Sequence, residues 1–367
     1  MISPYPAPGA DPEGGVEMSA VRLIDALTER NVDVTVVAPG AAGVERSGPV
    51  SVVRVPADQR WLLARSMRPW RAEVRRVIRD LSADVVHGQG LLWGGLPPTD
   101  ADWSRGADRS SFRRVVTAHG NVREDTIAAR SGLGGAVRVV LGQRLCRQAA
   151  EDVDVLVGAH PDWRVNVPRR PQHFVHIPNI VDDLFFQATR RPQAGRVLYC
   201  GGPGFIKGWD ILMRAWSLVA QRAPGARLEA LGFPAGYELP ATDGIARSIH
   251  LRGWVSVKET RDAMEQAKLL VIPSRFEVAP TVLAEAWAAG LPVLATAVGG
   301  TPTLADGGAW LVPPNDHVVL AAAIVAVLQR RLPVADVLKA GSTRAQAHRR
   351  EQVADAHLRL YANLAGA

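Results

Sequence analysis

The sequence predicts an α/β protein of two domains, each with a parallel β-sheet covered by helices. Short apolar runs of strand length alternate with segments whose apolar residues recur at helical spacing, which is typical of βαβ units. In the clearest unit, residues 269–296, a buried strand ends at Pro273-Ser274, a helix begins near Thr281, and a second apolar run follows Gly290. A length of 367 residues accommodates two such domains with full cores.

In the N-terminal half, strands are expected at residues 32–37, 51–55, 84–87, 114–119 and 153–157. Ile2 and Ser3 look like the end of an earlier strand whose beginning is missing, so we expect the chain to start inside the fold. Gly14-Gly15 precede a helix with one apolar face. A glycine pair at a helix start lets a phosphate or sugar approach the backbone, although such pairs are more often plain turns.

A helix is expected from Pro69 to about Leu81, since proline favours the first turn. Its apolar face comprises Trp70, Val74, Ile78 and Leu81, and the adjoining arginines are Arg71, Arg75 and Arg79. One interpretation is a basic surface that contacts anionic lipid. A solvated outer face of a sheet-covering helix is favoured over it.

In the C-terminal half, a polar, proline-containing linker at residues 187–195 precedes a strand at residues 196–200. Further strands are expected near Leu228, Ile249, Leu269, Val293 and Trp310. A final helix is expected over about residues 351–364.

Composition excludes several classes of protein. Charged residues make up 22% and hydrophobic residues 47%, as in ordinary globular proteins. No apolar run approaches the roughly 20 residues of a membrane helix, and no signal peptide opens the chain, so a cytoplasmic enzyme is expected. The only cysteines, Cys146 and Cys200, have apolar neighbours, so neither a disulfide framework nor a zinc site is predicted. The net charge of +7 is spread along the chain, without a nucleic-acid motif, and suits anionic small ligands or an anionic membrane face.

Two glutamates flank a predicted anion site. Glu277 lies on the loop after a strand, and Glu285 lies eight positions later in the first turns of the following helix. The backbone N–H groups of that helix start suit a phosphate, and ligands of such sheets bind at the carboxyl ends of the strands. An anion between two hydroxyl-binding carboxylates matches a nucleotide sugar.

Residues 273–296, with Pro-Ser, Glu-x7-Glu and Ala-Gly-x-Pro-Val, resemble the donor site of the GT4 family of retaining glycosyltransferases. That family has the GT-B fold, in which two Rossmann-like domains face each other across a cleft. The resemblance implies an acceptor-binding domain at residues 1–186 and a nucleotide-sugar-binding domain at residues 187–350. A C-terminal helix, residues 351–367, is expected to pack back on the first domain. Residues 176–185, with Pro-Asn-x-Val-Asp, resemble the family segment that ends the first domain.

The resemblance also implies roles for residues of the donor domain. Glu277 is expected to contact the donor sugar or its leaving group, and Glu285 to accept hydrogen bonds from the ribose hydroxyls. Lys207 is expected to grip the donor diphosphate. Thr281 and its neighbours are expected to offer backbone N–H groups to the diphosphate, although Ala279-Pro280 stands where the family usually has glycine, and proline removes one donor. Val255, in Gly253-Trp-Val, ends a strand where the family contacts the base through backbone.

In the first domain, His119 resembles the family histidine near the transferred sugar. A neutral imidazole there can hydrogen-bond a sugar hydroxyl or steady developing positive charge through its backbone carbonyl. His87 matches a second family position, expected to pack beneath the cleft. No task is predicted for His160, and Asp182-Asp183 is interpreted as structural rather than as a metal site.

Gly202 departs from the family pattern. The family loop reads Gly-Arg and then Lys-Gly, and Gly202 stands where the arginine is expected. Without the contact between this arginine and the diphosphate, a few kcal/mol of transition-state stabilisation are expected to be lost, unless another cation or the N–H groups of the glycine-rich loop replace it. Substituting arginine for Gly202 is therefore expected to be neutral or activating.

The resemblance implies a metal-independent transferase of the hexosyltransferase type, as in polysaccharide biosynthesis. It would move a sugar, with retention, from a nucleotide diphosphate sugar to a hydroxyl of a glycan, glycolipid or small molecule. The nucleotide sugar is a substrate, no cofactor is expected, and a peripheral contact with the inner face of the membrane is a further expectation. The base, the sugar and the acceptor stay open, and acceptor choice is expected to lie in loops such as residues 93–111.

The alternative is a nucleotide-sugar-binding protein or partner subunit that has lost catalysis, which Gly202 favours. A nucleotide-sugar epimerase is disfavoured by the Pro-Ser…Glu-x7-Glu arrangement. A nicotinamide dehydrogenase is disfavoured because no Gly-x-Gly-x-x-Gly opens a βαβ unit with a following acidic residue.

Overall fold

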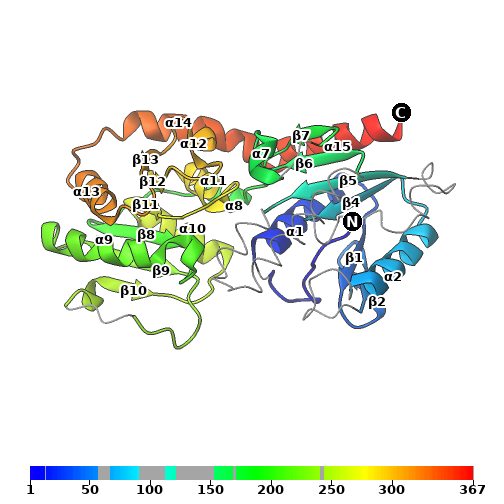
Figure 1. The fold of residues 1–367 in the computed structure, drawn as a ribbon, viewed down its shortest axis with the longest axis horizontal. Coiled ribbons are helices and arrows are strands. Elements are labelled where there is room, and N and C mark those ends of the chain that lie inside the picture. The colour runs from blue at the N-terminus through cyan, green and yellow to red at the C-terminus, as the bar shows by residue number, and fades with distance from the viewer. Residues whose placement is uncertain are drawn as a thin grey trace. The chain divides into compact units, whose positions relative to one another are not determined.

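The computed structural model describes residues 1–12, 14–56, 67–90, 112–120, 153–167, 171–239 and 244–366. The chain forms two compact units (Figure 1). Unit 1 comprises Met1–Ile180 with Arg350–Ala367, and unit 2 comprises Val181–Arg349. Loop 93–111, Cys146 and the side chain of Arg71 lie outside the described part of the chain.

Unit 1 contains the predicted parallel strands, with ends shifted by at most three residues. They are β1 (Thr35–Pro39), β3 (Val50–Val55), β4 (Val85–Gln89), β5 (Arg113–Ala118) and β6 (Val155–Gly158). Two further strands were not predicted: β2 (Gly43–Ser47), which pairs antiparallel with β3, and β7 (Phe174–His176), which pairs parallel with β6. Both are short and neither has a fully buried residue, so they lack the apolar run that marks the other strands.

Ile2 connects the two sheets of unit 1. The strand order is β1-β3-β2 in one sheet and β4-β5-β6-β7 in the other, and Ile2 forms parallel bridges to Val37 in β1 and Gly88 in β4. Its N–H donates to the His87 carbonyl at 2.8 Å, and its carbonyl accepts from the Gln89 N–H at 2.8 Å. Ile2 is 1% exposed, so its side chain also contributes to the core. The first residues thus occupy a strand position between β1 and β4.

The described helices of unit 1 pack against its two sheets. They are α1 (Gly15–Thr28), α2 (Met67–Asp80), α7 (Trp163–Asn166) and α15 (Arg350–Ala365). In α2 the predicted face is buried at Trp70, Val74 and Ile78. The C-terminal helix α15 packs against α1 and shares its core through residues such as Val353 and Leu360, so it belongs to unit 1.

Unit 2 is a six-stranded parallel sheet with the order β10-β9-β8-β11-β12-β13. Its strands are β8 (Arg196–Cys200), β9 (Arg227–Leu231), β10 (Ile249–Leu251), β11 (Leu269–Ile272), β12 (Val293–Thr296) and β13 (Trp310–Val312), all at predicted positions. The order reverses between β8 and β11, because successive strands are added outward on both sides of that pair. Such a switch point opens a crevice at the carboxyl ends of the two strands.

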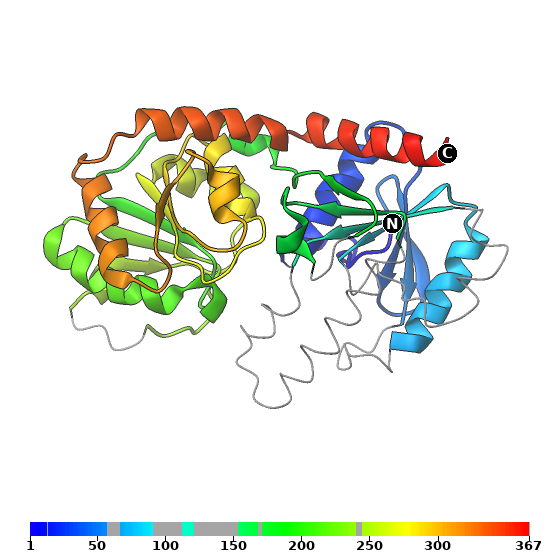
Figure 2. The same cartoon turned by 45° about the horizontal axis from the view of Figure 1, so that its top comes forward.

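The helices of unit 2 lie on both faces of its sheet. They are α8 (Asp183–Phe186), α9 (Trp209–Arg222), α10 (Val257–Gln266), α11 (Thr281–Ala288), α12 (Thr301–Ala305), α13 (His317–Leu328) and α14 (Ala335–Ala345). One face is covered by α9 and α13, which lie side by side, and the other by helices including α10 and α11 (Figures 1 and 2). Val181 and Phe185 pack in this second core, so unit 2 begins before the linker at residues 187–195.

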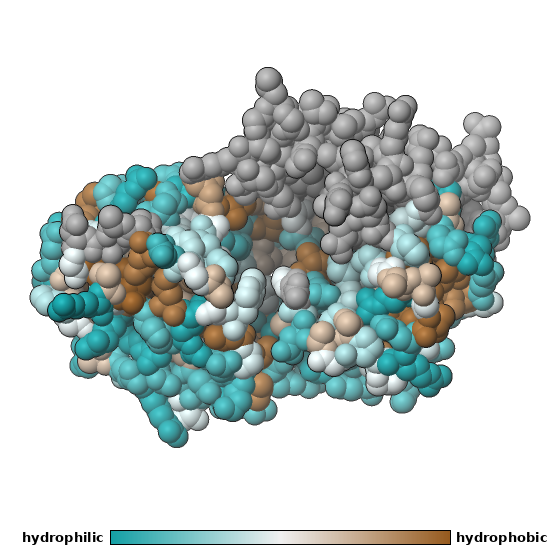
Figure 3. All heavy atoms as spheres, turned by 90° about the horizontal axis from the view of Figure 1, so that it is seen from below, coloured by the Kyte–Doolittle hydropathy of each residue, from teal (hydrophilic) through white to brown (hydrophobic). Residues whose placement is uncertain are grey.

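The described surface seen in Figure 3 is mostly hydrophilic, with separate apolar areas. None of the described helices combines the length and the apolar composition needed to cross a membrane.

Candidate functional site

The two loops at the switch point of unit 2 bring Lys207 and Glu277 together. Lys207 ends a 3₁₀ turn, η3 (Phe205–Lys207), after β8, and Glu277 lies on the loop after β11. Lys207 Nζ lies 2.8 Å from Glu277 Oε1, which also accepts from Ser274 Oγ at 2.7 Å. The Glu277 carboxylate is buried, whereas the Lys207 side chain is 40% exposed. A buried carboxylate therefore holds a cation that a ligand can still reach.

Arg275, which the sequence analysis did not single out, ties the two loops together. Its guanidinium donates to both oxygens of Asp210 at 2.7 and 2.8 Å and to the Phe205 carbonyl at 2.6 Å. The guanidinium also lies 3.8 Å from the centre of the Phe205 ring. Its hydrogen bonds to Asp210 lower the pKa of that carboxyl. Within the described loops 201–208 and 273–280, Lys207 is thus the cation left for a ligand. The pattern gave no signal for Arg275, because its partners are 65 and 70 positions away.

The expectation that Gly202→Arg is neutral or activating is wrong for this backbone. Gly202 has φ 62°, and a Cβ at this position would lie 2.5 Å from the Gly232 carbonyl oxygen. The loops after β8 and β9 approach too closely for a larger residue. The sequence analysis also suggested that the glycine-rich loop offers its N–H groups to phosphate. The first two N–H groups of the loop are not available for this, because those of Gly201 and Gly202 both donate to the Leu231 carbonyl, at 3.3 and 3.2 Å.

Gly202→Arg is therefore expected to lower the free energy of unfolding by about 2 kcal/mol or more, from the left-handed backbone and the contact with Gly232. Chemical denaturation of the variant measures this effect. The matched control is Gly204→Arg in the same loop, where φ is −61° and a Cβ would meet nothing closer than 3.8 Å. A Gly202→Arg protein that is as stable as the wild type and more active would show that the loop rebuilds around the arginine.

The helix α11 begins at Thr281 with Pro280 at its N-cap, and Glu285 follows, half-buried, one turn later. Burial raises the pKa of the thiol of Cys200, the last residue of β8, and the negative charge of Glu285 contributes to the same shift. The backbone of Glu277 is held by the loop after β12, whose Gly300 N–H donates to the Glu277 carbonyl at 2.8 Å. Lys207 and Glu277 thus meet at the switch point, and α11, which carries Thr281 and Glu285, begins after the same loop that carries Glu277.

The segment after β10 lies beside the loop after β9. The Gly253 carbonyl accepts from the Gly232 N–H at 3.1 Å, and the Arg252 carbonyl accepts from the Phe233 N–H at 3.1 Å. The half-buried Val255 side chain packs against the core. The Trp254 side chain is 81% exposed.

In unit 1, His119 follows β5 and is half-buried. Its Nε2 lies 2.7 Å from Gln89 Oε1, and burial, helped by His357, lowers the pKa of His119 to about 4. His87 is 3% exposed. Gly14 has φ 105° at the N-cap of α1, and the space around Gly14 and Gly15 is open, which leaves room for a ligand.

The remaining predicted features have structural explanations. Asp182 caps α8 by accepting from the Leu184 N–H at 3.0 Å. His160 is buried, and its Nδ1 accepts from the Asp162 N–H at 3.0 Å. No cluster of His, Cys, Asp or Glu able to hold a metal ion occurs among the described residues.

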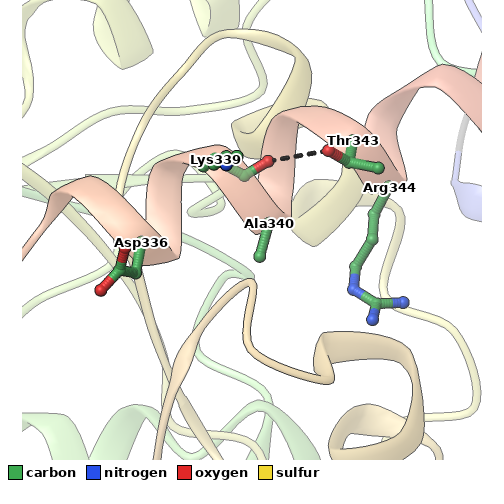
Figure 4. Close-up of a pocket in the computed structure, with 5 residues that line it drawn as sticks. All are labelled: Asp336, Lys339, Ala340, Thr343 and Arg344. Atoms are coloured by element: carbon green, nitrogen blue, oxygen red, sulfur yellow. Dashed lines mark hydrogen bonds between the residues drawn. The ribbon is translucent and has the colours of Figure 1, made fainter.

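A separate surface pocket lies along α14 and contains none of the predicted residues. Figure 4 shows its lining residues, Asp336, Lys339, Ala340, Thr343 and Arg344. Arg344 pairs with Asp306, which follows α12.

Comparisons with known proteins agree with the fold. Residues 13–183 match the family model "Glycosyltransferase Family 4", and residues 194–330 match "Glycosyl transferases group 1". The D-inositol 3-phosphate glycosyltransferase 1 of Catenulispora acidiphila is 30% identical over 349 residues, covering 84% of this chain and 80% of that protein. That of Geodermatophilus obscurus is 29% identical over 391 residues, covering 93% and 83%.

Two solved structures are similar over the whole chain. Sucrose-phosphate synthase from Thermosynechococcus elongatus has a TM-score of 0.73 at 20% identity and covers 98% of each chain. Anabaena Alr3699/HepE, in complex with UDP-glucose, has a TM-score of 0.70 at 15% identity and covers 98% of each chain.

The two parallel α/β units, with the site loops at a switch point, define a glycosyltransferase of the GT-B fold. The chain belongs to the GT4 family, the glycosyl transferases of group 1, and is an enzyme that transfers a sugar. The predicted family, fold class and general activity are confirmed.

Proposed function

We propose that the enzyme transfers a sugar from a nucleotide diphosphate donor bound at the carboxyl ends of β8 and β11. The observation that carries the proposal is the Lys207–Glu277 pair at 2.8 Å, in which a lysine side chain that is 40% exposed contacts a buried carboxylate. The complex of Alr3699/HepE with UDP-glucose, a protein of the same fold, supports a nucleotide sugar as donor. In this proposal Glu285 accepts from the ribose hydroxyls and the first turn of α11, beginning at Thr281, faces the diphosphate.

The proposed reaction breaks the bond between the anomeric carbon and the diphosphate oxygen, and its electron pair stays with the nucleotide. The acceptor oxygen forms the new bond on the same face of the sugar, and its proton passes to the departing phosphate. Negative charge therefore grows on the diphosphate as the bond breaks. Lys207 is the cation placed to stabilise it, while Glu277 holds Lys207 and contacts the sugar. In unit 1, His119 is proposed to contact the transferred sugar as a neutral imidazole.

We further propose that the reaction needs no metal ion. Lys207 and the positive end of α11 supply the charge that a divalent cation supplies in other phosphate-transferring sites. The names of the relatives point to a phosphorylated polyol, such as an inositol phosphate, as the first acceptor to test. Contact with an anionic membrane, through the basic face of α2, stays a prediction.

The proposal predicts that one nucleotide sugar of a panel of UDP, GDP, ADP and TDP sugars raises the melting temperature, because a ligand that binds the folded state stabilises it. Glu285→Ala should raise the donor KM and leave kcat nearly unchanged, since ribose contacts exist in both the ground and the transition state. The measurement is steady-state kinetics with and without EDTA. Asp336→Ala, an exposed carboxylate on α14, is the control.

Three results would contradict the proposal. They are a wild-type donor KM in Glu285→Ala, loss of wild-type turnover with EDTA, and the absence of any melting shift with all the nucleotide sugars.

A further inference from the structure

A buried chain of polar side chains runs from the C-terminal helix to His119 in unit 1. Tyr361 Oη of α15 lies 2.6 Å from His87 Nδ1 in β4, and His87 Nε2 lies 2.8 Å from Thr117 Oγ1 in β5. Gln89, two residues along β4, has Nε2 3.4 Å from His87 Nε2 and Oε1 2.7 Å from His119 Nε2. The chain therefore ends at the histidine proposed to contact the sugar.

The side chains in the middle of this chain are shielded from water, whereas Tyr361 and His119 at its ends are half-buried. His87 is 3% exposed, Gln89 1% and Thr117 5%. Buried polar atoms find their partners inside the protein, so the position of each group constrains the next. Packing adds to this constraint, because the rings of His357 and Tyr361 lie 5.7 and 5.8 Å from the His87 ring.

The direction of the Gln89 amide follows from its other neighbour. Gln89 Nε2 lies 3.6 Å from Met1 Sδ, and a thioether sulfur carries no proton and can only accept. The amide nitrogen therefore faces Met1 and His87, and the amide oxygen faces His119. An oxygen that can only accept requires a proton on His119 Nε2, which leaves the lone pair of this neutral ring on Nδ1.

We propose that Gln89 is a positioning residue that holds His119 as the neutral Nε2–H tautomer, with Nδ1 as the nitrogen to which a sugar hydroxyl donates. The inference rests on the proposed function for the role of His119, but the tautomer can be measured separately. Through His87 and Tyr361, Gln89 is also connected to α15. A glutamine suits this task because its amide oxygen accepts at any pH without adding charge.

The titratable groups around Gln89 and His119 are uncharged at neutral pH. They are His87, His357, Tyr361 and the amino group of Met1. After burial, His357 helps to lower the pKa of both His87 and His119, and the amino group of Met1 helps to lower that of His87. Burial lowers the pKa of His87 and lowers the pKa of His357 to about 4, and it raises the pKa of Tyr361. At neutral pH the imidazoles are therefore uncharged, and the tautomer of His119 depends on Gln89.

The first measurement is ¹⁵N NMR of the imidazole nitrogens of the wild-type protein, with His119 assigned by comparison with His119→Gln. We expect a protonated Nε2 and an unprotonated Nδ1 at neutral pH. The opposite tautomer would overturn the proposal, and this arm needs neither a variant of Gln89 nor a known substrate.

The second measurement compares two substitutions of Gln89. Gln89→Leu removes the acceptor, so His119 should become a mixture of tautomers and kcat should fall about tenfold, the scale of one hydrogen bond, with the donor KM little changed. Gln89→Glu keeps an acceptor, so the Nε2–H tautomer should persist. Its added negative charge stabilises the imidazolium, so the pKa of His119 should rise from about 4 and the acid limb of kcat should move to higher pH. At pH values above that acid limb, kcat of Gln89→Glu should be higher than kcat of Gln89→Leu.

Gln352→Leu, an exposed glutamine on α15, is the matched control and should behave as the wild type. An unchanged tautomer and kcat in Gln89→Leu would overturn the proposal, as would a Gln89→Glu protein with the acid limb of the wild type. If the tautomer behaves as expected but His119→Ala retains full kcat, the positioning by Gln89 stands and the proposed role of His119 fails.

Discussion

Lys207→Ala is expected to lower kcat about 100-fold or more, the scale of one lost electrostatic contact in a transition state. The donor KM should change much less, because the charge on the departing diphosphate grows only as the bond breaks. Lys207 Nζ touches Glu277 Oε1 at 2.8 Å, so the ammonium is already in place before the donor binds. Steady-state kinetics with the donor found in the melting panel measure both constants.

Glu277→Ala is expected to lower kcat as well, because that carboxylate holds Lys207 and orients the sugar. The control for the loss of one lysine is Lys258→Ala on α10, whose side chain is 71% exposed and pairs with Asp262 at 3.5 Å. It should retain wild-type kinetics. Full activity in Lys207→Ala, or an equal loss in Lys258→Ala, would contradict the assignment of the site.

Gly208→Ala is expected to lower the free energy of unfolding by about 3 kcal/mol or more, on the scale of overpacking and left-handed strain combined. Gly208 has φ 71°, and a Cβ would lie 1.9 Å from the Pro273 carbonyl oxygen, which belongs to rigid backbone at the end of β11. One of the two site loops must move to admit it. Because the same two loops hold Lys207 against Glu277, kcat should fall together with stability.

Chemical denaturation and kinetics of Gly208→Ala test this expectation. Gly225→Ala in the turn before β9 is the control, since a Cβ there meets nothing within 4 Å and its φ is not positive. A Gly208→Ala protein with wild-type stability would mean that the β8 and β11 loops separate easily. The close approach would then have no bearing on Lys207.

Most of the fold could be predicted from the sequence because its strands are buried on both faces. Strands such as β8 and β11 are short apolar runs bounded by glycine or proline, and helices such as α1 carry one apolar face, so local pattern and tertiary structure agree. The hairpin strand β2 and the edge strand β7 could not be predicted, because partly exposed strands lack that run and form only where β3 and β6 offer backbone partners.

The sequence by itself determined the α/β class, the family, and Lys207, Glu277 and Glu285 as candidates, because short motifs carry the chemistry of a phosphate and sugar site. Only the tertiary structure decided which of them touch. The contact between Lys207 and Glu277, the Arg275–Asp210 bridge and the contact between Tyr361 and His87 join residues 65 to 274 positions apart. It also decided that Gly202 has no room for an arginine, since the obstacle is the backbone of Gly232 on the neighbouring strand's loop. Local pattern cannot encode such contacts, because they arise when parallel strands place distant loops at the same edge of a sheet.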